Sequence, residues 1–241
     1  MVPGGSITLP TPATIPRMKP AEPAFEDVRR RILNAASAAN RPAPRLLAVS
    51  KSKPGAEVIA LAACGQRAFG ENYVQEGVGK AIELAALGLE WHMIGPLQSN
   101  KCREVAEHFD WLQSLDRPRL IEPLNRFRPA GRSPLNILVQ VNVDGESSKS
   151  GCAPDQALPL ARAVATASNL RLRGIMGIGA PFPELERRCV SFRRLRELFE
   201  AMQKEFPQVD TLSMGMSEDF ELAIAEGATM VRIGTSLFGP R

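Results

Sequence analysis

Residues 46–70, LLAVSKSKPGAEVIALAACGQRAFG, contain one complete strand–helix–strand repeat, from which the architecture of the chain can be predicted. Residues 46–50 form a short apolar strand, and Pro54 prevents that strand from continuing. A helix is predicted over 55–64 and a second strand over 67–69. Strands separated by a helix pair in parallel, since parallel strands need a long crossover connection.

The same alternation continues along the rest of the chain. Strands are predicted at 46–50, 67–69, 91–94, 111–115, 136–143, 171–178, 211–214 and 230–234. Helices are predicted between them at 55–64, 72–87, 100–108, 117–127, 154–168, 184–205 and 217–226. Eight such strands in 241 residues indicate an α/β fold, a single (β/α)8 TIM barrel. The alternative is a doubly wound open sheet, which usually carries a Gly-rich turn after its first strand; this chain has none there.

The two ends of the chain depart from this repeat. Residues 1–20 are rich in proline and predict a disordered arm, so the barrel domain is expected to span 21–241. A helix is predicted from Ala24 to Ala39, and its apolar face is expected to comprise Phe25, Val28, Ile32, Leu33 and Ala36. The chain ends at Arg241, soon after the last predicted strand, so no full eighth helix is expected. The extra N-terminal helix is expected to lie near that gap.

Composition excludes several classes of protein. The net charge is +4, and no run of lysines is interleaved with aromatic residues, so nucleic-acid binding is not expected. A weakly basic surface does suit small anions such as phosphates. Four cysteines without a C-x-x-C pair, and two histidines, indicate no metal site and a reducing, cytoplasmic compartment. Neither an apolar run long enough to span a membrane nor a signal peptide is found, so no membrane association is expected.

Lys51 stands where the first strand ends, and the active site of an α/β barrel lies at the C-terminal ends of its strands. A partly desolvated lysine amine there is easier to deprotonate and attacks carbonyl groups. The alternative is a solvated lysine that merely closes the strand, as expected for Lys53. By the same rule, further strand ends deliver these candidates: Gly70, Glu71, Asn72, Gly95, Pro96, Asn142, Asp144, Ser213 and Gly215.

The last two strand ends predict a phosphate site. Ser217 is a candidate N-cap for a helix that starts near it, and helix N-termini attract phosphate. Gly234 allows a close backbone approach, and Thr235 adds a hydroxyl. Barrels often bind phosphate between the loops that follow strands seven and eight. Ordinary capping and a C-terminal turn would explain the same residues.

Arg232 lies inside the apolar strand 230–234 and must find an acceptor there. That acceptor is either a protein carboxylate or a ligand's ring nitrogen or anionic group. A carbonyl-seeking lysine, a phosphate site and an arginine donor together suit a ligand with an aldehyde, a phosphate and an acceptor nitrogen. Pyridoxal 5′-phosphate has all three groups.

Several long motifs also carry a family resemblance: LLAVSKSKP (46–54), FGENYVQE (69–76), WHMIGPLQSNK (91–101), QVNVDGESSKSGC (140–152) and the run 212–239. They resemble the pyridoxal-phosphate homeostasis proteins (the YggS/PROSC group), which are related to the N-terminal barrel of alanine racemases. The resemblance implies a barrel that holds the cofactor as a Schiff base, and apo-enzymes that depend on pyridoxal phosphate as candidate recipients.

The resemblance also implies a role for each candidate residue. It implies that Lys51 forms the Schiff base, that Asn72 lies beside the cofactor and that Arg232 faces the pyridine nitrogen. It further implies that Ser217, Gly234 and Thr235 hold the phosphate.

Three functions fit these residues. A non-catalytic protein that stores, buffers or delivers the cofactor is favoured, because an arginine keeps the pyridine nitrogen unprotonated and weakens the ring as an electron sink. An amino-acid racemase-like enzyme is the alternative, but it needs a second acid/base, for which Tyr73, His92 and His108 are poor candidates. A Schiff-base aldolase acting on sugar phosphates would share the lysine and the phosphate site. The absence of a second domain is compatible with a monomer.

Overall fold

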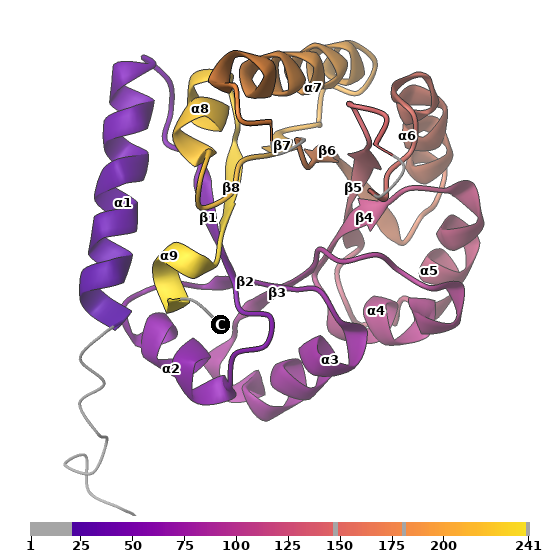
Figure 1. Ribbon diagram of the computed structural model, residues 1–241. Helices are drawn as coiled ribbons and strands as arrows, with labels where there is room; N and C mark the ends of the chain where they lie inside the picture. The colour runs from indigo at the N-terminus through magenta and orange to yellow at the C-terminus, as the bar shows by residue number, and fades with distance from the viewer. Residues whose placement is uncertain (1–20, 147–148, 180–181, 240–241) are drawn as a thin grey trace, which may run out of the picture.

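The computed structural model describes residues 21–146, 149–179 and 182–239, and it contains a closed barrel of eight parallel strands. Figure 1 looks along the barrel axis, with the helices arranged around the strands. In chain order the strands are β1 (Arg45–Val49), β2 (Ala68–Glu71), β3 (Glu90–Met93), β4 (Trp111–Leu115), β5 (Leu135–Val141), β6 (Leu170–Gly177), β7 (Thr211–Ser213) and β8 (Met230–Ile233). The arm predicted at 1–20 lies outside the described residues.

Pairing between the first and last strands closes the barrel. Leu47 of β1 is in register with Arg232 of β8, and Ala48 is in register with Ile233. On its other side β1 pairs with β2, where Val49 is opposite Gly70. This closure confirms the predicted (β/α)8 barrel over the open sheet, and it brings the ends of β1 and β8 side by side.

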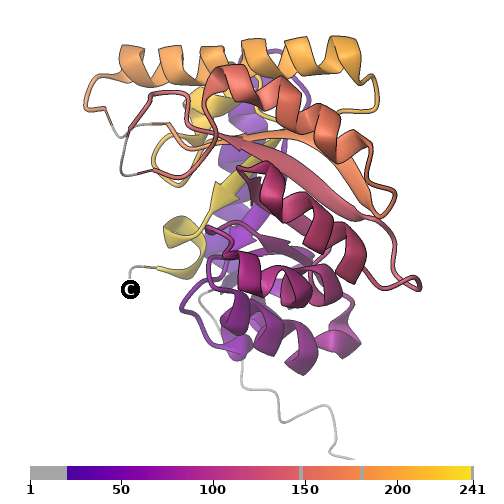
Figure 2. The same ribbon diagram turned by 90° about the vertical axis from the view of Figure 1, so that its right-hand side faces the viewer.

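Helices cover the outside of the barrel (Figures 1 and 2). The α-helices are α1 (Ala21–Ala38), α2 (Gly55–Ala63), α3 (Val74–Glu83), α4 (Cys102–His108), α5 (Ile121–Phe127), α6 (Ala157–Ala165), α7 (Leu185–Glu205), α8 (Phe220–Ala225) and α9 (Thr235–Phe238). In the described ranges, none of the helices is both long and apolar enough to cross a membrane.

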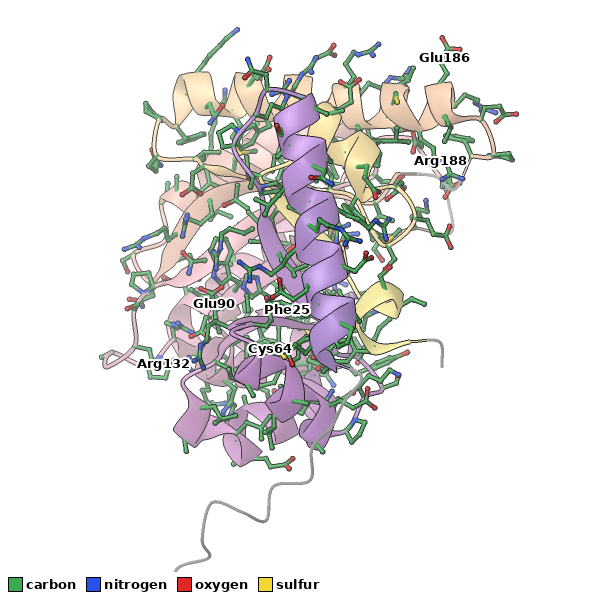
Figure 3. The ribbon with its side chains drawn as sticks, turned by 90° about the vertical axis from the view of Figure 1, so that its left-hand side faces the viewer. Phe25, Cys64, Glu90, Arg132, Glu186 and Arg188 are labelled. Carbon is green, nitrogen blue, oxygen red and sulfur yellow. The ribbon has the colours of Figure 1, made fainter. Side chains whose placement is uncertain are left out.

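The extra N-terminal helix α1 packs against α2, α8 and α9, where the barrel has only a one-turn helix after β8. Figure 3 shows α1 lying along this side of the molecule, with Phe25 near its start. Its buried face consists of Phe25, Val28, Ile32 and Ala36, four of the five residues expected there. The fifth, Leu33, is 54% exposed.

The sheet has one apolar layer on its outer face and one on its inner face, because successive strand residues point to opposite faces. The larger layer fills the space between strands and helices and includes Ala48, Phe69 and Ile233. Two small clusters form the layer inside the barrel: Leu47, Ala68 and Met230, then Trp111, Leu138 and Met176. The barrel interior also holds buried polar side chains.

Several helix boundaries differ from the predicted ones. Three predicted helices begin with a 3-10 turn, at Ser99–Lys101, Pro118–Leu120 and Pro154–Gln156, a common geometry at helix N-termini. The helix predicted at 72–87 ends at Glu83 and is followed by the 3-10 turn Ala85–Leu87. Near the C-terminus, the helix expected from Ser217 begins only at Phe220.

Candidate functional site

A cavity of about 340 Å3 opens at the C-terminal ends of the strands. All six residues predicted for the site line it: Lys51, Asn72, Ser217, Arg232, Gly234 and Thr235. They come from both ends of the chain and meet because β1 pairs with β8. The rest of the lining comprises Val49, Ile94, Ile178, Gly179, Arg188, Met216, Glu218 and Asp219.

Lys51 follows β1 in a short loop whose backbone is fixed on both sides. The Ser50 N–H donates to the carbonyl oxygen of Gly70 at 3.0 Å. The Ser52 N–H donates to Glu76 Oε1 at 2.6 Å, and Ser52 has a left-handed φ of 61°. These contacts hold a half-buried Lys51 at the cavity wall.

A buried ionic cluster supports this loop from behind. The Glu71 carboxylate is fully buried and accepts hydrogen bonds from Ser50 Oγ at 2.6 Å and Lys80 Nζ at 2.7 Å. Lys80 Nζ also donates to the Ser50 carbonyl oxygen and to Glu76, each at 2.7 Å. Burial raises the pKa of Glu71, and the hydrogen bonds from Lys80 and Ser50 counteract that rise. Glu71, expected among the strand-end candidates, therefore contributes to the support of the site and does not line the cavity.

Asn72 lines the cavity, and the loop after β3 packs directly against its backbone. A Cβ atom added at Gly95 would lie 2.1 Å from the Asn72 carbonyl oxygen, which no side chain can tolerate. Glycine at position 95 therefore allows the loops after β2 and β3 to pack in contact.

The loops after β7 and β8 meet at the predicted phosphate site. Ser217 Oγ accepts a hydrogen bond from the Gly234 N–H at 3.4 Å. A Cβ atom at Gly234 would lie 3.3 Å from the Val49 carbonyl oxygen, so this turn packs tightly on β1. Thr235 is exposed at the first position of α9, where helical N–H groups have no partner within the helix.

The prediction that Ser217 is a helix N-cap is wrong. The helix α8 starts at Phe220, with Asp219 at its N-cap position. Asp219 Oδ1 accepts the Met216 N–H at 2.7 Å, which closes a turn before the helix. The Ser217 hydroxyl instead contacts the neighbouring loop, a contact between residues 17 positions apart that local sequence does not indicate.

Arg232 lies at the floor of the cavity and is only 4% exposed. Its Nη1 donates to Ser213 Oγ and its Nη2 to the Gly177 carbonyl oxygen, each at 2.9 Å. Both acceptors are neutral, so the protein carboxylate considered from the sequence is not its hydrogen-bond partner among the described residues. Burial lowers the pKa of the guanidinium to about 10, against the opposing charge of Asp219, and it remains a cationic donor at neutral pH.

Arg188 is a lining residue that the sequence did not single out. It lies on α7 and its Nε donates to the Phe182 carbonyl oxygen. Figure 3 places Arg188 on the side of α9, and Glu90 and Arg132 toward the opposite side. Within a helix rich in arginine, nothing in the sequence distinguishes this position from its solvated neighbours.

Comparisons with known proteins show the family to which this chain belongs. Residues 25–241 match the family model described as the alanine racemase N-terminal domain. The chain is 56% identical over 216 residues to the pyridoxal phosphate homeostasis protein of Pseudomonas aeruginosa, covering 89% of this chain and 93% of that protein. It is 53% identical over 199 residues to the protein of the same name from Escherichia coli K12, covering 81% and 85%.

A solved structure also matches this chain over most of its length. The structure of PipY from Synechococcus elongatus with pyridoxal phosphate bound superimposes with a TM-score of 0.79 at 36% identity. The match covers 91% of this chain and 100% of that chain. The chain therefore belongs to the pyridoxal phosphate homeostasis protein family, within the alanine racemase N-terminal domain superfamily of barrels.

Proposed function

We propose that this protein binds pyridoxal 5′-phosphate as a Schiff base on Lys51 and serves cofactor homeostasis by storage, buffering or delivery. The observation that carries the proposal is one cavity lined by the lysine Lys51, by Ser217 and Thr235 with their hydroxyls, and by the buried Arg232. Arg232 lies on β8, and the other groups follow β1, β7 and β8, strands that closure of the barrel brings together.

The residues present fit this cofactor. The cavity of about 340 Å3 falls in the range of roughly 300–1,000 Å3 typical of small-molecule sites. The hydroxyls of Ser217 and Thr235 and the N–H groups at the start of α9 suit a phosphate. Arg232 supplies a buried donor for the ring nitrogen, and Lys51 supplies the amine for the aldehyde.

The lining favours binding over turnover. The cofactor supplies an aldehyde that reacts with amines and a ring that accepts electrons. Arg232 presents N–H donors, so a ring nitrogen facing it stays unprotonated and the ring withdraws electrons weakly. Among the described residues that line the cavity there is neither a tyrosine nor a histidine, and the Tyr73 side chain is 62% exposed outside it. A racemase-like reaction would need a second acid/base. The carboxylates in the lining are those of Glu218, which is exposed, and Asp219, whose Oδ1 accepts the Met216 N–H.

The names of the relatives support a homeostatic role, since both curated proteins are called pyridoxal phosphate homeostasis proteins. The solved PipY structure supports the cofactor itself. The proposal includes a cytoplasmic monomer that passes its cofactor to apo-enzymes dependent on pyridoxal phosphate and does not bind nucleic acid.

A transfer measurement tests this function. Protein loaded with pyridoxal phosphate is mixed with an apo-enzyme, and the recovery of enzyme activity is compared with the rate of cofactor release into a trap. We expect the loaded protein to be yellow. We also expect enzyme activity to recover at a rate equal to or higher than the rate at which the cofactor is released into the trap. A protein that binds no cofactor, or that retains it in the presence of a competent apo-enzyme, would overturn the proposal.

A further inference from the structure

A chain of buried hydrogen bonds starts at Arg232 and crosses the barrel interior. Arg232 Nη1 donates to Ser213 Oγ at 2.9 Å, and Ser213 Oγ donates to Gln113 Oε1 at 2.8 Å. Ser213 and Gln113 are fully buried. Gln113 belongs to β4 and Ser213 to β7, which are not neighbouring strands, so their side chains can meet only inside the barrel.

The chain continues to the opposite end of the barrel. Gln113 Nε2 lies 2.9 Å from His92 Nδ1, and His92 Nε2 lies 2.6 Å from Glu90 Oε1. Glu90 is the first residue of β3, and its carboxylate also accepts Arg45 Nη2 at 2.7 Å. The His92 ring stacks on Trp111 with centroids 5.0 Å apart, which fixes its plane.

One arrangement of hydrogens satisfies every contact. Gln113 accepts the Ser213 hydroxyl through its oxygen, so its NH2 group must face His92. Nδ1 of His92 is then the acceptor, and the neutral ring carries its proton on Nε2, which donates to Glu90. All donors therefore point from Arg232 toward the Glu90 carboxylate.

The charges at the far end support this direction. Burial lowers the pKa of His92 and keeps the ring neutral, although Glu90 and Asp110 act in the opposite sense. Burial would raise the pKa of Glu90, but the hydrogen bonds from His92 and Arg45 and the positive charge of Arg45 outweigh it and lower the pKa. A carboxylate at one end polarises each hydrogen bond of the chain in the same sense.

We propose that Ser213, Gln113 and His92 are positioning residues for Arg232. Their chain fixes the orientation of the guanidinium, so that its remaining N–H donors are aimed at the ring of a ligand in the cavity. Without the chain, Arg232 would keep only the Gly177 carbonyl oxygen as a neutral partner among the described residues. The inference rests on the proposed function, because the ligand is pyridoxal phosphate.

The opposing explanation is that this chain only satisfies polar groups in the barrel core. Stability alone does not separate the two, since a broken buried chain destabilises the fold in either case. The electronic state of a cofactor whose ring faces Arg232 does separate them. A second test is whether a substitution in the hydrogen-bond chain still changes cofactor binding when Arg232 itself has been replaced.

The primary variant is Gln113→Leu, and its matched control is Gln66→Leu. Gln66 is also a buried glutamine, but it donates to the carbonyl oxygens of Leu46 and Ala68 and is not part of the chain. The readouts are the absorption maximum of bound pyridoxal phosphate, its pH dependence, and the Kd from direct titration. We expect Gln113→Leu to shift the band and to raise Kd about tenfold, the cost of weakening one hydrogen bond to a charged group. Gln66→Leu should change neither.

The coupling test uses an Arg232→Leu background. There we expect Gln113→Leu to change Kd less than twofold, because its effect passes through the guanidinium. Ser213→Ala, a smaller change that retains the fold more readily, should reproduce the band shift if Gln113→Leu fails to fold. An unchanged band in both variants, or the same loss in the Arg232→Leu background, would overturn the inference. Failure of the wild-type protein to bind cofactor would instead refute the proposed function.

Discussion

Thr235 places its hydroxyl at the start of α9, beside Ser217 and the Gly234 turn. If this corner holds the phosphate, Thr235→Val should weaken binding of pyridoxal phosphate about tenfold, the value of one hydrogen bond to a charged group. Binding of pyridoxal, which lacks the phosphate, should stay unchanged. Direct titration with both ligands measures the difference.

The control for this prediction is Thr166→Val. Thr166 follows α6 and its hydroxyl donates only to the Ala163 carbonyl oxygen, so the same substitution there should affect neither ligand. Equal losses for the two ligands in Thr235→Val would place the phosphate elsewhere.

The strand-end rule made the six lining residues candidates, because barrels build their sites there. The same rule offered eight further residues that do not line the cavity, and the roles of the six were implied by the family resemblance. Arg188 and Lys80 could not be found in this way. Both are basic residues within helices, where a solvated side chain is the usual outcome. Only the packing of α3 on β2 shows that Lys80 is 6% exposed.

At the scale of elements, the ion pair between α3 and β2 supports the loop that carries Lys51. Removing one partner leaves a buried charge, so Lys80→Met should destabilise the protein by roughly 3–5 kcal/mol. Replacing both partners, with Glu71→Leu and Lys80→Met together, should recover most of that loss. Urea denaturation measures each free energy of unfolding.

The matched control is Lys101→Met. Lys101 and Glu104 form a surface pair at 2.9 Å, which is worth about 0–1 kcal/mol. A Lys80→Met variant no less stable than Lys101→Met would show that the buried pair does not support the loop.

Apolar strands and their order were predictable because buried strands read as short apolar runs. The start of α8, in contrast, was not predictable from the sequence. Ser217, Glu218 and Asp219 resemble a capped first turn, but Asp219 closes a turn with Met216 and the Ser217 hydroxyl contacts Gly234. Such contacts between loops override local capping preference.

At the scale of the whole molecule, closure of the barrel is what makes the site. Pairing of β1 with β8 sets Lys51 next to the turn at Gly234, more than 180 residues later in the chain. The strand count predicts this proximity. The hydrogen-bond chain through the interior was not predictable, because Gln113 and Ser213 meet across the barrel, 100 residues apart, and no local pattern links them.

Lys51 is the lysine proposed to hold the cofactor, and chemical trapping tests this directly. Pyridoxal phosphate is added to the wild-type protein, the adduct is reduced with borohydride, and the modified peptides are identified by mass spectrometry. The same experiment is run on Lys51→Ala and on the control Lys53→Ala, whose lysine donates to the Phe238 carbonyl oxygen outside the cavity lining. We predict modification at Lys51 in the wild type and in Lys53→Ala, and loss of the adduct in Lys51→Ala. An adduct of equal yield in Lys51→Ala would contradict the account. So would one that forms, while Lys51 stays unmodified, on Lys53 or on Lys149, which donates to the carbonyl oxygen of the lining residue Gly179.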